Sequence, residues 1–318
     1  MRPLGALLIP GLLIAGAAGA RAQGTTGGIL LDMPATARSM AMGGASAALL
    51  GDAGSVFGNP AGLALIKGTA LSVSYERYLV DSWLASAALA VRISKLDIGF
   101  GIHILDFGSD SAYVPDPAFG GDRGLATGAT IGAYDALGVG TLTYRHGFLS
   151  AGVSFKALRE HIGTGDAPSD NASAFGADVG IAAAFFDIAA LGVVVQNVGS
   201  AVHGGTSARA PLPHATRVGF TINFIDPQGT ARLLTTTEWV APAASHHYWI
   251  FGFEGGVVSR GVGILGRMGV LAGRGATDLR SPVFGGGLVF HDLRLDYAYQ
   301  GTNVLGDGLH RMTVGWVW

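Results

Sequence analysis

The feature that most constrains this chain is a two-residue alternation that runs through most of it after Gly68. Large apolar side chains occupy one parity, and polar or very small side chains occupy the other. Between 95 and 106, one parity holds Leu96, Ile98, Phe100, Ile102 and Ile104, and the other holds Asp97, Gly99, Gly101 and His103. A period of two is the pattern of a β-strand whose two faces meet different surroundings. The sequence therefore predicts an all-β fold from 68 to 318.

The number and spacing of the alternating segments indicate a closed membrane barrel. Roughly fourteen segments of about ten residues follow one another, which is the strand length of an antiparallel transmembrane barrel. Short connections, such as 94–95 and 146–147, alternate with long ones, such as 108–129, 161–172 and 199–213. Short turns on one rim and long loops on the other are typical of outer-membrane barrels. A soluble sandwich has no reason to sort its connections in this way.

Composition helps to decide between a membrane barrel and a soluble sandwich or propeller. Charged residues make up only 13% of the chain, and the face opposite the apolar one is mostly Gly, Ala, Ser and Thr. A solvent-facing sheet would carry many more Lys, Glu and Asp side chains. Aromatic residues lie toward strand ends, as in the girdles at a membrane interface; they are Tyr75, Tyr78, Trp83, Trp239, Trp249, Trp316 and Trp318. We therefore expect outer-membrane lipid as a partner, and the net charge of -2 argues against nucleic acid.

The N-terminus has the features of an export signal. A basic start at Arg2 is followed by an apolar stretch and by Ala20-Arg21-Ala22, which predicts a signal peptide over 1–22. The chain contains no cysteine, which excludes a lipid-anchored cysteine, disulfides and thiolate chemistry. Beyond the signal, no charge-free apolar run reaches the roughly 18 residues of a spanning helix. A membrane-spanning mature chain must therefore span as strands.

Residues 23–67 form the one long stretch of the mature chain without alternation. Short helical patterns there are broken at Gly43-Gly44, and Asn59-Pro60 predicts a turn. About fourteen strands enclose more space than wall side chains can fill. We therefore predict that 23–67 is a partly helical plug, or hatch, inside a barrel formed by 68–318. The alternative is an ordinary N-terminal helix packed on a soluble sheet.

No pattern in the sequence supports an enzyme, a cofactor or a metal. Residues 261–266 match G-x-G-x-x-G, but no helix follows as a nucleotide site requires. His246-His247 falls in a predicted loop, where a solvated tip is more common than a metal site. No G-x-S-x-G or H-E-x-x-H stands out. We therefore predict a non-enzymatic protein with no catalytic, cofactor-binding or metal-binding residues.

Two stretches resemble the N-terminal signature of the PorV/PorQ family, a branch of the FadL-like outer-membrane barrels. They are 37–45 and 59–63, and their matching residues are Arg38, Met42, Gly43, Gly44, Asn59, Pro60, Ala61 and Gly62. Gln196-Asn197, Leu212-Pro213, 295–299 and His310-Arg311 agree with the same family. The resemblance implies a fourteen-stranded barrel with an N-terminal hatch, in the outer membrane of a Gram-negative-type bacterium, with both termini periplasmic.

The resemblance implies that the same barrel fold can serve either of two functions. PorV-like members act in type IX secretion as accessory or shuttle proteins that bind exported cargo and secretion-system components. FadL-like members transport long-chain fatty acids or other hydrophobic small molecules. The N-terminal residues favour the secretion role, and transport is the alternative. For either function, we expect the long connection 108–129 to contact a partner or an incoming ligand. The residues that would make this contact are Tyr113, Pro115, Pro117 and Phe119. The alternative, which fits the sequence equally well, is that this connection is a mobile lid without a partner. The terminal Trp316 and Trp318 resemble the recognition signal for barrel assembly.

Overall fold

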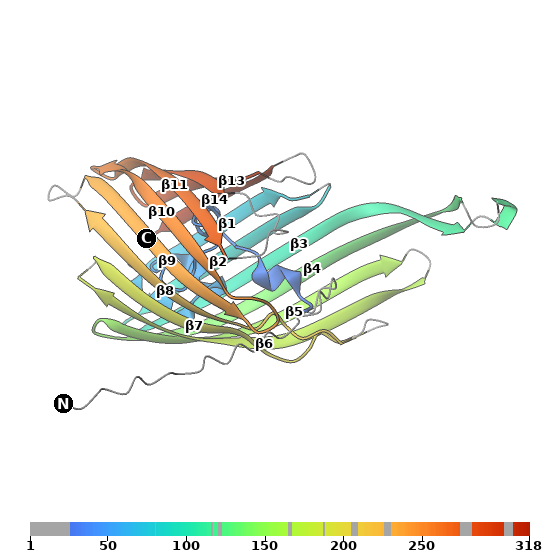
Figure 1. Cartoon of the computed structure of the whole chain (residues 1–318), viewed down its shortest axis with the longest axis horizontal. Coiled ribbons are helices and arrows are strands. Elements are labelled where there is room, and N and C mark those ends of the chain that lie inside the picture. Colours follow the sequence, from blue (N-terminus) through green and yellow to red (C-terminus); the bar gives the residue numbers. More distant parts are fainter. Residues whose placement is uncertain are drawn as a thin grey trace, which may run out of the picture.

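The backbone forms a closed barrel of fourteen antiparallel strands (Figure 1). The computed structural model describes residues 26–79, 81–115, 117–119, 123–164, 167–186, 188–204, 209–225, 230–273, 282–301 and 308–318. The strands are β1 (Thr69–Arg77), β2 (Trp83–Ile93), β3 (Leu96–Pro115), β4 (Gly124–His146), β5 (Leu149–Thr164), β6 (Ala167–Phe185), β7 (Ala189–Gly199), β8 (Ala215–Ile225), β9 (Ala231–Pro242), β10 (Tyr248–Ser259), β11 (Val262–Ala272), β12 (Val283–Phe290), β13 (Leu293–Gln300) and β14 (Leu309–Val317). The predicted antiparallel barrel of about fourteen strands is confirmed. The predicted signal peptide lies outside the described residues.

Each strand pairs with its two sequence neighbours, and β1 closes the ring by pairing with β14. Tyr75 of β1, for example, lies opposite Ala85 of β2 and Met312 of β14. Closure removes the unpaired edges that an open sheet exposes. In a membrane the same pairing gives the backbone donors and acceptors of the strands partners within the wall, as hydrocarbon surroundings demand.

The two faces of the wall differ as the alternation predicts. Phe100 on β3 is 60% exposed and Phe155 on β5 is 67% exposed, and both point outward. The intervening Asp97 and His103 of β3 and Lys156 of β5 are buried in the lumen. The apolar parity therefore covers the outside of the barrel, and the polar and small parity lines its bore.

The connections divide into two rims. We call the end with 94–95, 147–148 and 291–292 the turn rim, and the opposite end the loop rim. The prediction of a long loop at 108–129 is wrong, because β3 continues to Pro115 and β4 begins at Gly124. The hairpin of β3 and β4 projects beyond the other strands (Figure 1). Most of 161–172 is likewise strand in β5 and β6. A hairpin outside the lipid is held by backbone pairing and needs no apolar outer face. Its strands therefore lack the alternation of apolar and polar side chains by which the strands of the wall were predicted.

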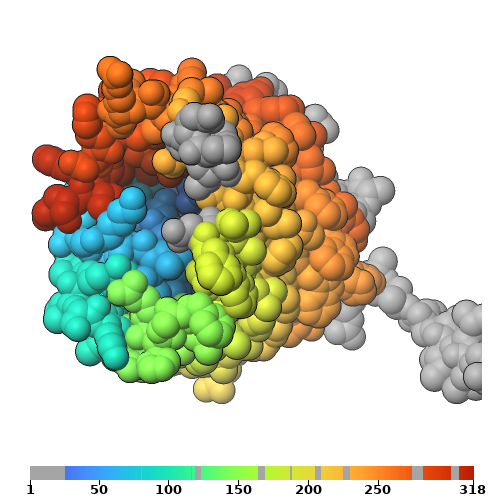
Figure 2. All heavy atoms as spheres, turned by 90° about the vertical axis from the view of Figure 1, so that its left-hand side faces the viewer, coloured from blue at the N-terminus to red at the C-terminus, as the bar shows by residue number. Residues whose placement is uncertain are grey.

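The N-terminal segment, residues 26–67, lies inside the barrel. Its short helices are η1 (Ile29–Asp32), α1 (Ala37–Ala41), η2 (Ala53–Phe57) and η3 (Pro60–Leu65). Figure 2 looks into the turn-rim mouth, where blue atoms of this segment fill the centre of the ring of strands. Side-chain caps start three of the helices, as such residues commonly do: Thr36, Asp52 and Asn59 accept hydrogen bonds from the amides of Ser39, Gly54 and Ala61. Within the described residues, no helix has the length and apolarity to cross a membrane.

Aromatic side chains gather near both rims on the outer surface. Tyr75 stacks on Trp83 near the loop rim, with ring centroids 6.4 Å apart, and Trp316 meets Trp318 edge-on near the turn rim at 5.8 Å. Tyr78 departs from the prediction, because it packs against apolar residues inside the lumen. It follows the last residue of β1, where the strand alternation no longer fixes the direction of the side chain.

Candidate functional site in the lumen

The N-terminal segment touches the wall where the inward-facing residues are glycines. A Cβ at Gly192 of β7 would overlap the carbonyl oxygen of Ala47, and a Cβ at Gly180 of β6 would overlap the Oδ1 of Asn59. Similar approaches occur at Gly99, Gly101, Gly152, Gly219, Gly252, Gly269 and Gly285. We call these nine inward positions the glycine collar. Backbone atoms of the segment make the close approach at five of them, Gly152, Gly192, Gly219, Gly252 and Gly269, and side chains of the segment make it at the other four. Only glycine lets the segment lie this close to the wall.

Glu238 of β9 anchors the middle of the segment. One of its carboxylate oxygens accepts hydrogen bonds from the amides of Ser46 at 2.8 Å and Ala47 at 2.7 Å. Its other oxygen accepts from Arg217 of β8, whose Nη2 donates to the Gly44 carbonyl at 2.7 Å. The buried carboxylate and guanidinium therefore neutralise each other while both hold the backbone of the segment.

Asn59 organises the second anchor. Its Nδ2 donates to the carbonyl of Ala47 at 2.7 Å and to that of Ile181 on β6 at 3.3 Å, while its Oδ1 accepts from the Ala61 amide. The hydroxyl of Thr143 donates to the Pro60 carbonyl at 2.6 Å. The Asn-Pro-Ala-Gly turn singled out in the sequence thus holds η3 against β4 and β6. Gly62 packs beside Ser55 within the segment.

An ionic network anchors α1. Arg38 pairs with Glu254 of β10 at 3.3 Å, and Glu254 also pairs with Arg267 of β11 and with Arg294 of β13. Asp296 joins Arg267 at 3.0 Å and Arg294 at 2.8 Å. Next to this network, Met42 is fully buried and Gly43 lies against β11. The structure therefore places the eight sequence-predicted residues of the segment at its contacts with the wall or at its internal turns.

Three more ion pairs lie in the lumen. Glu76 pairs with Arg311, Asp97 with Arg92 at 2.9 Å and Asp178 with Lys156 at 2.7 Å. Lys156 also donates to the Oδ1 of Asn197, and the Nδ2 of Asn197 donates to the Pro213 carbonyl at 2.9 Å. This contact brings together the Gln196-Asn197 and Leu212-Pro213 stretches, and it holds the β7–β8 connection over the lumen.

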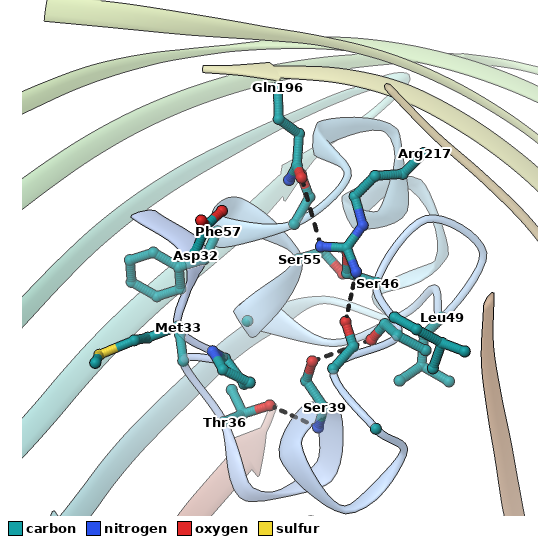
Figure 3. A pocket seen from close by; sticks show the side chains of 18 of the residues that line it. Asp32, Met33, Thr36, Ser39, Ser46, Leu49, Ser55, Phe57, Gln196 and Arg217 are labelled. Carbon is teal, nitrogen blue, oxygen red and sulfur yellow. Dashed lines mark hydrogen bonds between the residues drawn. The ribbon is translucent and has the colours of Figure 1, made fainter. Parts of the chain in front are cut away.

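A small cavity of about 80 Å³ separates the segment from β7, β8, β9 and β10 (Figure 3). Arg217, Gln196 and Tyr248 line it from the wall, and Asp32 and Ser46 line it from the segment. An engineered cavity of about 150 Å³ that binds benzene is larger and wholly apolar. This cavity is therefore too small and too polar to hold a hydrocarbon.

The loop-rim half of the lumen carries an apolar lining instead. Buried side chains from β2 to β6 and from the β7–β8 connection meet there; they are Leu84, Leu105, Leu137, Val139, Leu158, Ala172, Ala174, Val202 and Leu212. We call this set the luminal cluster. Leu30 of η1 is 1% exposed and packs into it, with Leu31, Met33 and Phe57 alongside. This set was not predicted from the sequence, where its one signal is large leucines at the inward parity near the loop-rim ends of the strands.

The wall is irregular next to the luminal cluster. The β3–β4 register shifts between Asp106 and Ser109, and Gly108 adopts a positive φ of 77°. Outside this shift lies an open notch of about 410 Å³, whose lining includes Tyr134 and His161. Leu105, the last inward residue before the shift, belongs to the luminal cluster. The interior apolar lining and the exterior notch therefore lie on either side of this register shift in the barrel wall.

The remaining sequence-predicted residues lie away from the lumen. Tyr113 is 62% exposed on the projecting hairpin, Pro115 ends β3, and Pro117 begins the short helix η4 (Pro117–Phe119). The side chain of Phe119 falls outside the described part. Trp318 pairs with Thr69 through two backbone hydrogen bonds, and Trp316 and Trp318 are both exposed. No group of three or more His, Cys, Asp or Glu side chains suited to a metal occurs among the described residues.

The chain matches no protein-family model and no curated protein. Solved structures resemble it along nearly its whole length. The toluene transporter TbuX of Ralstonia pickettii has a TM-score of 0.61 at 13% identity, covering 91% of this chain and 99% of that one. TodX, a toluene transporter of Pseudomonas putida, has a TM-score of 0.58 at 12% identity, covering 90% and 98%. A Pseudomonas aeruginosa FadL homologue has a TM-score of 0.54 at 13% identity, covering 89% and 98%. At these identities the likeness establishes a FadL-like fold.

Proposed function

We propose that the protein is an outer-membrane channel for small hydrophobic molecules and that residues 26–67 close its bore. The luminal cluster carries this proposal. A water-filled pore has a polar interior, whereas leucines from five neighbouring elements line this half of the bore. An apolar patch inside a wall that is also apolar outside gives a hydrocarbon a place to leave water. The toluene transporters among the structural neighbours support the same reading.

Passage through this channel requires movement of the N-terminal segment. Leu30 occupies the luminal cluster, and the cavity beside the segment is too small for a hydrocarbon. We infer that a solute displaces η1 from the cluster and leaves toward the β3 irregularity at 106–109. There the β3–β4 pairing is interrupted directly beside Leu105 of the luminal cluster.

Toluene flux into proteoliposomes tests the proposal. Leu105→Ser and Leu137→Ser place hydroxyls in the luminal cluster and should each reduce flux several-fold. Leu265→Ser is the matched control, because Leu265 is also a buried inward leucine but lies on β11, outside the cluster. Equal flux through wild type and all three variants contradicts the proposal. Migration of unheated protein on denaturing gels checks that each barrel has folded.

We further propose that the turn rim faces the periplasm. Thr69 and Trp318 pair with each other, so both ends of the barrel wall lie on this rim. Short turns face the periplasm in outer-membrane barrels, and the longer connections face outward. An epitope inserted between Pro115 and Pro117 should be detected on intact cells, while one placed after Trp318 should need permeabilisation. The reverse labelling contradicts this orientation.

The type IX secretion role is the second candidate, and the projecting hairpin of β3 and β4 is the observation that favours it. Tyr113, Val114 and Leu125 are exposed there, beyond the wall that lipid would cover. Exposed apolar side chains of this kind often mark a protein contact. Shortening the hairpin across 110–129 should retain exported cargo in the periplasm if this role holds. Unchanged secretion with unchanged toluene flux assigns the hairpin to neither function.

A further inference from the structure

The outer surface of the barrel carries a polar and aromatic row near the loop rim. Its members are direct cross-strand partners at one height on five neighbouring strands; they are Trp83, Asp106, Tyr134, His161 and Asn171. Toward the turn rim, Ile102 and Phe100 of β3 and Phe155 of β5 are exposed and apolar. Trp and Tyr side chains of membrane proteins gather at the level of the lipid headgroups. In a membrane this row therefore lies where the acyl tails end and the headgroups begin.

The outer notch of about 410 Å³ opens within this row. Its lining includes Asp106, Tyr134 and His161, and the rings of the last two have centroids 4.9 Å apart. Three glycines also line it, Gly108, Gly132 and Gly163, and they have no side chain to fill it. The volume falls within the range of small-molecule sites, about 300–1,000 Å³. At this height the ligand that fits is a headgroup rather than an acyl tail.

The two ends of the notch differ in charge. On β5, the exposed Arg159 lies one outward position below His161, and its Nη2 donates to the Oδ1 of Asn171 at 3.0 Å. A guanidinium has five N–H donors, so this contact leaves others for an anion. On β3, Asp106 accepts a hydrogen bond from the amide of Gly108 at 2.8 Å. The carboxylate lies two strand spacings from the guanidinium, about 10 Å across the sheet.

This arrangement is the complement of a phosphorylated sugar. A guanidinium binds phosphate through charge-assisted hydrogen bonds. The apolar C–H face of a sugar ring packs on an aromatic ring such as that of Tyr134, and sugar hydroxyls donate to a carboxylate such as that of Asp106. A phosphate headgroup without a sugar would bring no donor to Asp106. The outer leaflet of an outer membrane is built largely from phosphorylated glycolipids, which carry both groups.

We propose that the notch binds the phosphorylated sugar headgroup of an outer-leaflet glycolipid. The phosphate binds Arg159, the sugar ring packs on Tyr134, and a hydroxyl donates to Asp106. The acyl chains follow the apolar outer face of β3 toward the turn rim. This site is separate from the channel function, and it relies on the proposed outward orientation of the loop rim.

Native mass spectrometry of the detergent-solubilised protein tests the proposal with lipid A, phosphatidic acid and glucosamine 1-phosphate. Lipid A carries both sugar and phosphate, and it should bind about tenfold more tightly than phosphatidic acid. Arg159→Gln should weaken lipid A binding by about ten- to a hundredfold. Tyr134→Ser should weaken it by about two- to tenfold, because only the stacking contact is lost.

Tyr144→Ser and Arg260→Gln are the matched controls. Tyr144 lies on the same outward face of β4 as Tyr134, but opposite Leu96 near the turn rim. Arg260 is an exposed arginine in the turn-rim connection between β10 and β11. Both variants should bind lipid A as the wild type does, and migration of unheated protein on denaturing gels checks that every barrel has folded.

The outcomes decide between a glycolipid site and its alternatives. Equal binding of lipid A and phosphatidic acid overturns the assignment, and so does lipid A binding that survives Arg159→Gln or Tyr134→Ser. Binding of glucosamine 1-phosphate as tight as that of lipid A also overturns it, because a soluble sugar phosphate would then suffice. Protein in detergent presents both rims, so these results do not depend on the membrane orientation, which the epitope labelling tests separately.

Discussion

Replacing Gly192 by alanine should open the channel. Gly192 faces the lumen on β7, and a Cβ there would overlap the carbonyl oxygen of Ala47. The amide of the same Ala47 donates a 2.7 Å hydrogen bond to Glu238 of β9, so the segment cannot shift away from the wall without losing this contact. The wall cannot yield either, because Gly192 lies between Ala182 of β6 and Gly219 of β8 in the paired sheet. The strain must therefore fall on the N-terminal segment.

The size of the effect follows from these contacts. Overpacking a well-fitted interface costs about 1–3 kcal/mol, and the lost hydrogen bond adds about 1 kcal/mol. Anchorage of the segment should therefore weaken by roughly 2–4 kcal/mol. Since 1.4 kcal/mol corresponds to a factor of ten, the displaced fraction should rise about 30- to 700-fold. Toluene flux into proteoliposomes should rise until another step limits it.

The control for this substitution is Gly140→Ala. Gly140 faces outward on β4, and nothing lies within 4 Å of a Cβ placed there. Both variants should fold to the same heat-resistant barrel on denaturing gels, and limited proteolysis should cut residues 26–67 faster only in Gly192→Ala. Wild-type flux and proteolysis in Gly192→Ala would refute the idea that close backbone contact at the glycine collar holds the segment in place.

Three further predictions address the anchors and the C-terminus. Asn59→Ala removes one hydrogen bond to the wall, at Ile181, and two that hold the turn of the segment in shape. Together these losses should destabilise the docked segment by about 2–4 kcal/mol, seen as its faster proteolysis within an intact barrel. Arg38→Met removes the only cation that the segment contributes to the Glu254 network among the described residues. Because Arg267 and Arg294 still neutralise Glu254, the anchorage of the segment should weaken by only about 1 kcal/mol. Proteolysis should therefore be slower than in Asn59→Ala. Deleting 316–318 should lower the outer-membrane yield, whereas Trp249→Ala, which removes an exposed tryptophan near the loop rim, should not.

The anchors of the N-terminal segment were partly predictable from the sequence. Three of its residues can be recognised from their local sequence: Arg38 is a charge in an apolar stretch, Gly43 belongs to a glycine pair, and Asn59 begins an Asn-Pro turn. Their partners do not stand out. Glu254, Gly192 and Ile181 sit in strands far along the chain, and only closure of the ring brings them to the same bore.

The boundary of the wall was less predictable. The strands of the β3–β4 hairpin continue beyond Asp106 with Ser109, Ser111 and Thr130, whose spacing lacks an apolar parity. Outside the lipid the backbone pairing alone maintains the hairpin, so the hydropathy pattern ends before the strands do. The luminal cluster was missed for a different reason: Leu84, Leu105 and Leu158 are single apolar residues among small and polar inward neighbours of their strands.

The sequence by itself determined the repeated strand, the two faces of the wall, the sorting of its connections and the separate character of residues 26–67, because each of these is written in a local period or composition. The tertiary structure alone decided which inward residues meet. Asp135 and Glu160 face each other, and Gly192 meets Ala47, through the strand register and the closure of the barrel. Register is a cooperative property of the whole ring, and a shift of a single residue would turn every one of these side chains to the other face.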